Sequence, residues 1–270
     1  MLRPSVAVFF LTYYVLAGLG VNLGYHRVLS HRSLKLPKWF ERILVTLGLP
    51  AGTPVQWAGN HRYHHAHTDT PLDPHSPLHR GFWYAHVGWY LGSKSVFWCV
   101  LYCLAGPVRM LIDAWMRPRT NQENNALARD LAADSYYRWI SRPWPYCFAM
   151  HLHLIIPAVI AWRLWGLGGE VVLWMTLVAL YNLGDAIDSV SHLYGSPLPG
   201  QQDNARNSVV MGLLILGDGW HANHHRFPWS AKHGLTRAQF DWTWQVIRGL
   251  RAIGIAQDIR VASDTDLLRN

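Results

Sequence analysis

The stretch that decides the fold runs from His61 to Trp89 and reads HRYHHAHTDTPLDPHSPLHRGFWYAHVGW. It opens with His61, His64 and His65, spaced i, i+3 and i+4. On an α-helix these three imidazoles share one face and can converge on a metal ion. The stretch therefore predicts a helix that carries one side of a metal site.

Two further clusters repeat this chemistry far away in the chain. His221, His224 and His225 have the identical spacing, and His26 is followed by His31. Neutral imidazole is a ligand for zinc, copper, iron and nickel. A single cluster would favour a histidine-rich surface tract or one zinc bound by three histidines. Three clusters instead favour a buried site for several metal ions.

The spacing of His26 and His31 differs from that of the other clusters. Residues five apart on an α-helix lie roughly 140° around its axis. We therefore expect that the pair cannot share a helix face, and that His26 lies on a last turn with His31 beyond it.

The composition indicates a membrane protein. Half of the 270 residues are hydrophobic and 15% are charged, against about a quarter charged in soluble domains. The 15 tryptophans and 12 tyrosines are typical of membrane–water interfaces. The net charge of +8 comes without a nucleic-acid-binding motif, so we expect membrane lipid and no nucleic acid as a partner. The three cysteines are expected to be reduced packing residues.

The apolar segments predict an all-α integral membrane protein that forms one domain over residues 1–270. Uncharged runs of about twenty residues can cross a bilayer. We expect three such spans, with the remaining segments interfacial or cytoplasmic and forming a helical cap over the metal site. The spans are residues 5–25, 145–165 and 170–192, and the other segments are residues 26–142 and 193–270.

Topology constrains two further apolar segments, because the histidine clusters must meet on one side of the membrane. Ile43–Trp57 contains Pro50 and Pro54 and should dip and return. Ser95–Trp115 should lie in the interface, since the hairpin joined by a tight turn at Gly166–Gly169 already supplies two crossings.

Charge asymmetry predicts the orientation. The hairpin turn lacks Lys and Arg, whereas Arg117, Arg119, Arg138 and Arg142 lie on the other side. By the positive-inside rule the histidines are cytoplasmic and the N-terminus is outside. A bacterial inner membrane is the expected location. The basic tail from residue 230 to 270 should contain a helix near Phe240–Ile253.

A fourth candidate ligand position lies at the end of the last span, where Asp188 and His192 are spaced i, i+4. His151 and His153 are expected to be structural. Supporting or surface positions are expected for the remaining histidines, which are His67, His75, His79, His86 and His233.

Nine histidines are too many for one zinc and fit two metal ions with about five ligands each. Iron is the natural occupant for oxygen chemistry, although the ligand type alone leaves zinc and manganese open. A site at the membrane surface suits a lipid tail as substrate.

Several motifs together resemble the membrane-bound fatty acyl desaturases of the stearoyl-CoA type, including bacterial delta-9 members. The motifs are GYHRVLSHR, NHRYHH and GDGWHANHHRFP, with DPH, RGF and HVGW between them. The resemblance covers about residues 10–260. It implies an oxidoreductase that uses two iron ions, O2 and two electrons to convert a saturated fatty acyl chain into a cis mono-unsaturated one, most often at the ninth carbon.

The resemblance also implies two ligand sets and an electron donor. One iron would be held by His26, His31, His61, His65 and His224, and the other by His64, His192, His221 and His225. The electron donor would be a separate ferredoxin or cytochrome. Trp57, Asn60 and Arg80 are implied to contact the substrate.

Two departures from the family pattern affect these expectations. Asp188 stands where the family usually has Asn, so a charged ligand could alter the chemistry. Gly59-Asn60 replaces an Arg-Asp pair that contacts CoA, which leaves acyl carrier protein or a glycerolipid open as the acyl carrier. Residues 94–125 are also longer than the family pattern predicts.

Two alternatives stay open. A sister di-iron lipid hydroxylase or acetylenase shares most of the pattern. A metal-binding membrane transporter belongs to another class, but it would need ionisable residues in the middle of several spans.

Overall fold

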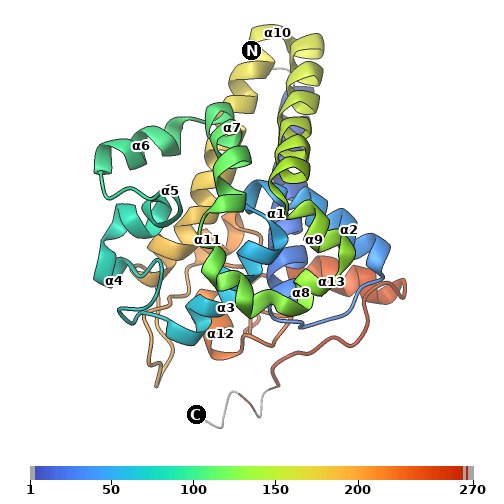
Figure 1. Cartoon of the computed structure of the whole chain (residues 1–270). Helices are drawn as coiled ribbons and strands as arrows, with labels where there is room; N and C mark the ends of the chain where they lie inside the picture. The colour runs from blue at the N-terminus through green and yellow to red at the C-terminus, as the bar shows by residue number, and fades with distance from the viewer. Residues whose placement is uncertain (1–3, 264–265, 267–270) are drawn as a thin grey trace.

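The computed structural model of the chain describes residues 4–263 and 266. Within them the secondary structure is helical, with isolated bridges instead of β-strands. Long apolar helices stand side by side at one end of the molecule, and shorter helices gather at the other end (Figure 1). The predicted all-α architecture is therefore confirmed.

The first long segment consists of α1 (Pro4–Leu19) and the π-helix η1 (Gly20–Ser30). Together they are long and apolar enough to cross a bilayer. Val8 and Leu11 on α1 are more than 60% exposed. Apolar side chains that remain exposed along such a helix are expected where lipid replaces water.

The second long element, α10 (Pro143–Ser189), is a helical hairpin (Figure 1). It reverses direction at Gly166, whose φ of 58° and ψ of −144° lie outside the helical region. The helix resumes at once, so the turn is shorter than the predicted Gly166–Gly169. A Cβ on Gly169 would lie 2.6 Å from the Ala161 carbonyl oxygen, which shows how closely the two halves approach. α1 with η1, and α10, are the two helices of the described part that are long and apolar enough to cross a bilayer. Three spans, with one in each half of α10, stay a prediction.

The segment between the first two histidine clusters consists of two α-helices joined by a short turn, and that it dips and returns stays a prediction. Thr53 caps the second of its two α-helices by accepting a hydrogen bond from the Gln56 backbone, and Pro54 occupies the first turn. The elements are α2 (Lys38–Leu47), the short 3₁₀ turn η2 (Leu49–Ala51) and α3 (Pro54–His67).

The segment predicted to lie in the interface is a bent pair of helices, α6 (Val96–Leu104) and α7 (Pro107–Met116). Their axes differ by 114° when α7 is extended to Arg119. The helices have nine and ten residues, and only as a pair are they long and apolar enough to cross a bilayer. Their interfacial placement stays a prediction. Phe97 and Trp98 on α6 are exposed, as expected for an interfacial helix.

The remaining elements are short and pack around the ends of the long helices. They are α4 (Pro77–Arg80), η3 (Tyr84–Gly88), α5 (Trp89–Leu91), η4 (Arg117–Arg119), η5 (Gln122–Ala128), α8 (Arg129–Ala133), α9 (Ser135–Ile140), η6 (Val190–His192), α11 (Val209–Leu214), α12 (His221–Arg226) and α13 (Trp242–Ala252). The last of them, α13, is the helix predicted near residues 240–253. The predicted tail to residue 270 extends past the described residues.

Candidate metal centre

The π-helical end of the first span brings His26 and His31 together. In a π-helix the backbone hydrogen bond closes between residues five apart, and the His31 amide donates to the His26 carbonyl at 3.1 Å. The two rings lie 5.0 Å apart between centroids. His31 follows the helix end as predicted, but the expectation that the pair cannot share a face was wrong, because it assumed α-helical winding.

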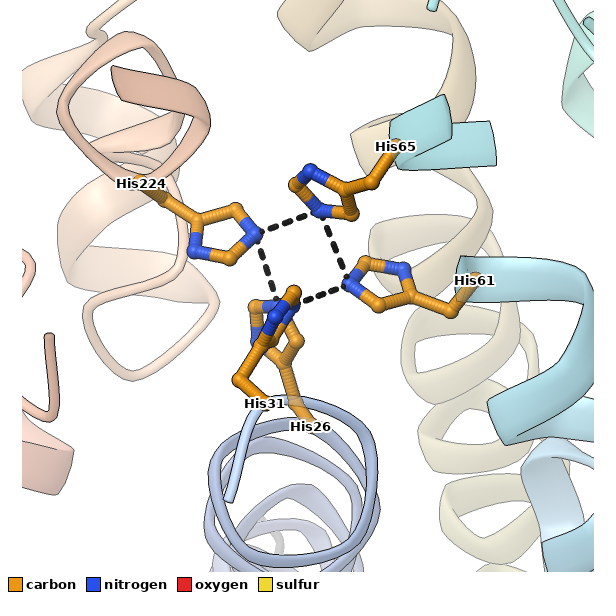
Figure 2. Close-up of side chains that lie close together, drawn as sticks. All are labelled: His26, His31, His61, His65 and His224. Carbon is orange, nitrogen blue, oxygen red and sulfur yellow. Dashed lines mark hydrogen bonds between the residues drawn. The ribbon is translucent and has the colours of Figure 1, made fainter. Parts of the chain in front are cut away.

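Five histidines from three distant segments form the first group, here called the five-histidine group (Figure 2). One ring nitrogen from each lies within 4.8 Å of the others. The closest Nε2 pairs are 2.8 to 3.1 Å apart. The members are His26, His31, His61, His65 and His224.

The second group, here called the four-histidine group, is built in the same way from α3, η6 and α12. Its ligand nitrogens also lie within 4.8 Å of one another. His221 Nε2 is 3.0 Å from His192 Nε2, and His64 Nε2 is 3.4 Å from His225 Nε2. The two groups are adjacent, since the ring centroids of neighbouring His64 and His65 on α3 are 5.5 Å apart.

These separations fit metal ligation. Nitrogens bound to one ion at about 2.1 Å lie about 3 Å from each other when their bonds meet at right angles. Desolvation, reinforced by neighbouring imidazoles, holds the pKa of His61, His65 and His224 well below the usual value. Desolvation and His75 likewise lower the pKa of His64 to about 4, against the opposing effect of Asp73. Neutral imidazoles present lone pairs, as a metal requires.

Carboxylates orient four of the nine histidine rings by binding the ring nitrogen that faces away from the group centre. Each accepts a hydrogen bond from a histidine Nδ1, which leaves Nε2 free to face the group centre. Sequence reasoning missed these partners, although three lie in motifs already singled out for other reasons. The pairs are His26 with Asp218 (2.9 Å), His64 with Asp73 (3.0 Å), His192 with Asp69 (3.2 Å) and His225 with Asp203 (3.1 Å).

Burial alone would raise the pKa of Asp69, but the hydrogen bond and charge of His192, with a bond from the Asn204 amide, lower it to about 2. Asp69 therefore stays ionised at neutral pH and holds the His192 tautomer that directs Nε2 to the metal site.

Two supporting histidines are buried beside the groups. His75 stacks on His64 with ring centroids 4.3 Å apart, and His233 Nδ1 lies 3.2 Å from Asp218. The other histidines outside the two groups lie elsewhere: His86 bonds to Ser189 on α10, His79 is exposed, His67 is partly exposed, and His151 and His153 bond to backbone carbonyls.

Asp188 is placed outside both groups. Its Oδ1 is 4.0 Å from His75 Nδ1, and its side chain lines a cavity instead. The helix ends at Ser189 and His192 follows in a 3₁₀ turn, so the regular i, i+4 relationship expected for Asp188 and His192 does not hold.

This cavity has a volume of about 150 Å3 and reaches from the five-histidine group to the spans. His26 and His61 contribute to one part of its wall, and Tyr14 and Leu180 of the long helices to another. Of the predicted substrate residues, Trp57 and Asn60 line it. Trp57 also stacks on His61, with ring centroids 4.9 Å apart. Arg80 does not line the cavity: it is exposed and lies over the ring of Tyr84.

The fold and the site define a helical membrane protein with a histidine centre that can hold metal ions. Comparison with known proteins gives the family. The fatty acid desaturase family model matches residues 4–246. The chain belongs to this family, which uses iron.

Relatives with assigned names are similar along nearly the whole chain. An acyl-CoA 5-desaturase of Anemone leveillei is 36% identical, covering 94% of this chain and 71% of its own length. An sn-1 stearoyl-lipid 9-desaturase of Anabaena variabilis is 30% identical, covering 96% and 85%. A chloroplastic palmitoyl-monogalactosyldiacylglycerol delta-7 desaturase of Arabidopsis thaliana is 33% identical over 98% of this chain. This chain spans 64% of the length of that relative.

Proposed function

We propose that this chain is a fatty acyl desaturase that converts a saturated acyl chain into a cis mono-unsaturated one. The observation that carries the proposal is the convergence of nine imidazoles into two adjacent groups beside a cavity that extends between the spans. The names of the relatives agree with this chemistry.

The two histidine groups would hold two iron ions. The five-histidine group would hold one and the four-histidine group the other. Bound iron supplies the oxidising power for breaking unactivated C–H bonds with O2, which acid–base side chains cannot provide. The chain's own contribution is to present neutral imidazoles, to fix their tautomers through the four carboxylates, and to lead the acyl chain past the site.

The cavity is the proposed acyl site. Its wall from the spans includes Tyr14, Ala17 and Leu180, whose surfaces suit a hydrocarbon chain. The same cavity reaches His26 and His61, so a chain bound there would pass the five-histidine group. A metal transporter would instead need ligands along a path through the spans, whereas these histidines gather at one end of them.

The packing of η5 on α3 weighs against CoA as the acyl carrier, and a glycerolipid is the proposed carrier, in line with the stearoyl-lipid relative. A Cβ on Gly59 would lie 2.4 Å from the Asn124 carbonyl oxygen, so this position has no room for a side chain. Asn60 is buried and accepts a hydrogen bond from Asn124 at 2.8 Å. Gly59 therefore cannot carry a side chain, and the Asn60 amide oxygen is already bound to Asn124, so neither position offers the charged contacts that the family's Arg-Asp pair would make with CoA. Desaturation at the ninth carbon is the proposed position, in line with the stearoyl-lipid relative.

The remaining parts of the proposal concern the surroundings of the enzyme. The histidine centre would face the cytoplasm of a bacterial inner membrane, by the charge asymmetry of the loops. A separate ferredoxin or cytochrome would deliver the two electrons.

Fatty-acid profiling tests the proposed function. The gene would be expressed in a host of defined lipid composition, together with a ferredoxin and its reductase. Lipid classes would be separated and double bonds located by mass spectrometry. A new mono-unsaturated chain in glycerolipids, absent with a His64→Ala variant, is the expected result. Hydroxylated or acetylenic products would replace the proposal with a sister chemistry. Iron-loaded protein that leaves every lipid unchanged would contradict the proposal.

A further inference from the structure

Arg117 is a buried cation on the wall of the acyl cavity. It begins η4, directly after α7, and is 6% exposed. Among the described residues that line this cavity, it is the only arginine or lysine. Its Nε is buried and lies 3.5 Å from Asp113. Its two Nη atoms make no hydrogen bond with any of the described residues, yet they are not among the buried unpaired atoms. They can therefore donate to a ligand in the cavity without breaking an existing hydrogen bond.

Neighbouring side chains hold the Arg117 guanidinium in place. Its Cζ lies 3.5 Å from the centre of the Tyr90 ring, a close cation–π contact. The Tyr90 hydroxyl donates to Asp185 at 3.0 Å, and Arg109 Nη2 is 2.7 Å from the same carboxylate. A planar donor fixed in this way is preorganised for an acceptor on a substrate.

The charge balance indicates what kind of acceptor fits. Arg109 and Arg117 are matched by Asp113 and Asp185, so the cluster is already neutral. A phosphate or carboxylate would add an uncompensated charge in a poorly solvated place. A neutral carbonyl oxygen satisfies the free donors without that cost.

We propose that Arg117 binds the ester carbonyl oxygen of the acyl substrate. This inference rests on the proposed function and adds the residue that would recognise the head end of the chain. One cavity then contains a donor for the carbonyl, the imidazoles of the metal centre, and an apolar wall for the hydrocarbon. A carbonyl held at a fixed place would set which carbon lies beside the metal centre.

A comparison of ester and ether lipids tests the inference without turnover. The probes are distearoyl phosphatidylglycerol and its dialkyl ether counterpart, which has the same chains and headgroup but no carbonyl. Their competition for the purified full chain is measured by native mass spectrometry. Because a hydrogen bond to a charged group contributes appreciably, wild type should prefer the ester by roughly tenfold or more. Equal binding of the two lipids by wild type would overturn the inference.

Two variants locate the preference. Arg117→Met should bind ester and ether alike, whereas Arg119→Met, an exposed change in the same η4 turn, should keep the wild-type ratio. Because the readout is a ratio within one protein, a lower yield of folded variant does not affect it. If Arg117→Met does not fold, Arg117→Lys keeps the charge but loses the planar fork, and its ratio should fall. If the Arg117 variants keep the wild-type preference for the ester lipid, the inference is overturned.

Product mapping separates this inference from the proposed function. With stearoyl and palmitoyl lipids, wild type should place the double bond at one distance from the carbonyl, and the Arg117 variants should spread it over neighbouring positions. An inactive wild type that still prefers the ester would contradict only the desaturase proposal. An active wild type whose Arg117 variants keep one double-bond position would contradict only the role of Arg117.

Discussion

Asp73 orients a proposed metal ligand from outside the histidine clusters. Its carboxylate accepts from His64 Nδ1 at 3.0 Å and from the backbone amides of Asp69 and His75. We expect Asp73→Asn to weaken iron binding in the four-histidine group by about ten- to a hundredfold, as loss of such an orienting carboxylate does elsewhere. Iron content after dialysis against a graded chelator measures this effect. Asp258→Asn, which alters an exposed pair with Lys35, is the control and should retain wild-type iron.

Asp188 gives a second prediction at the residue scale. Because it lies beside His75 and outside both histidine groups, Asp188→Asn should leave the iron content unchanged and the enzyme active. Metal analysis and fatty-acid profiling of the same preparation check this. Loss of one iron equivalent would instead identify Asp188 as a ligand.

Residue spacing predicted the histidines much better than their partners. The repeated i, i+3, i+4 pattern identifies a helix face, so the residues of α3 and α12 could be selected directly. The partners lie in loops without hydrophobic periodicity, as Asp69, Asp73 and Asp203 do. In such a loop the sequence does not distinguish a buried aspartate that binds a histidine from one exposed to solvent. Arg117 was noted only as a loop charge for topology, because nothing in its neighbours predicts burial.

At the scale of the element, the π-helix η1 was beyond prediction. The sequence predicts a span over residues 5–25 with His26 on a last turn, but the choice between α and π winding depends on packing. Here Gly20 and Gly24 pack closely against α2: a Cβ on Gly20 would be 2.7 Å from the Leu44 carbonyl oxygen, and one on Gly24 would be 3.1 Å from the Leu44 Cβ. By contrast, the hairpin α10 was predicted because length, hydropathy and a glycine-rich turn all agree.

The contact between α3 and η5 can be tested through Gly59. A Cβ there meets the Asn124 backbone at 2.4 Å, so Gly59→Ala should destabilise the protein by about 1–3 kcal/mol through overpacking. Thermal unfolding in detergent reports the change. Gly249→Ala, in open space within α13, should instead stabilise by about 0.5–1 kcal/mol. A Gly59→Ala protein as stable as wild type would contradict the close packing.

At the scale of the whole molecule, the arrangement of spans predicts which surfaces are accessible from each side. Gly168 lies near the hairpin tip, where an added Cβ would meet no other atom within 4 Å. The three native cysteines are buried. Gly168→Cys should react with an impermeant thiol reagent added outside intact cells. Ala238→Cys, on the exposed surface at the histidine end, should react only after the cells are opened. The reverse pattern would invert the proposed orientation.

The iron content of the purified protein tests the central claim most directly. Two groups of five and four imidazoles predict about two iron ions per chain by plasma mass spectrometry. His64→Ala should reduce this to about one, since only the four-histidine group loses a ligand. One zinc per chain in place of iron, or a His64→Ala protein that keeps the full complement, would contradict the two-iron site.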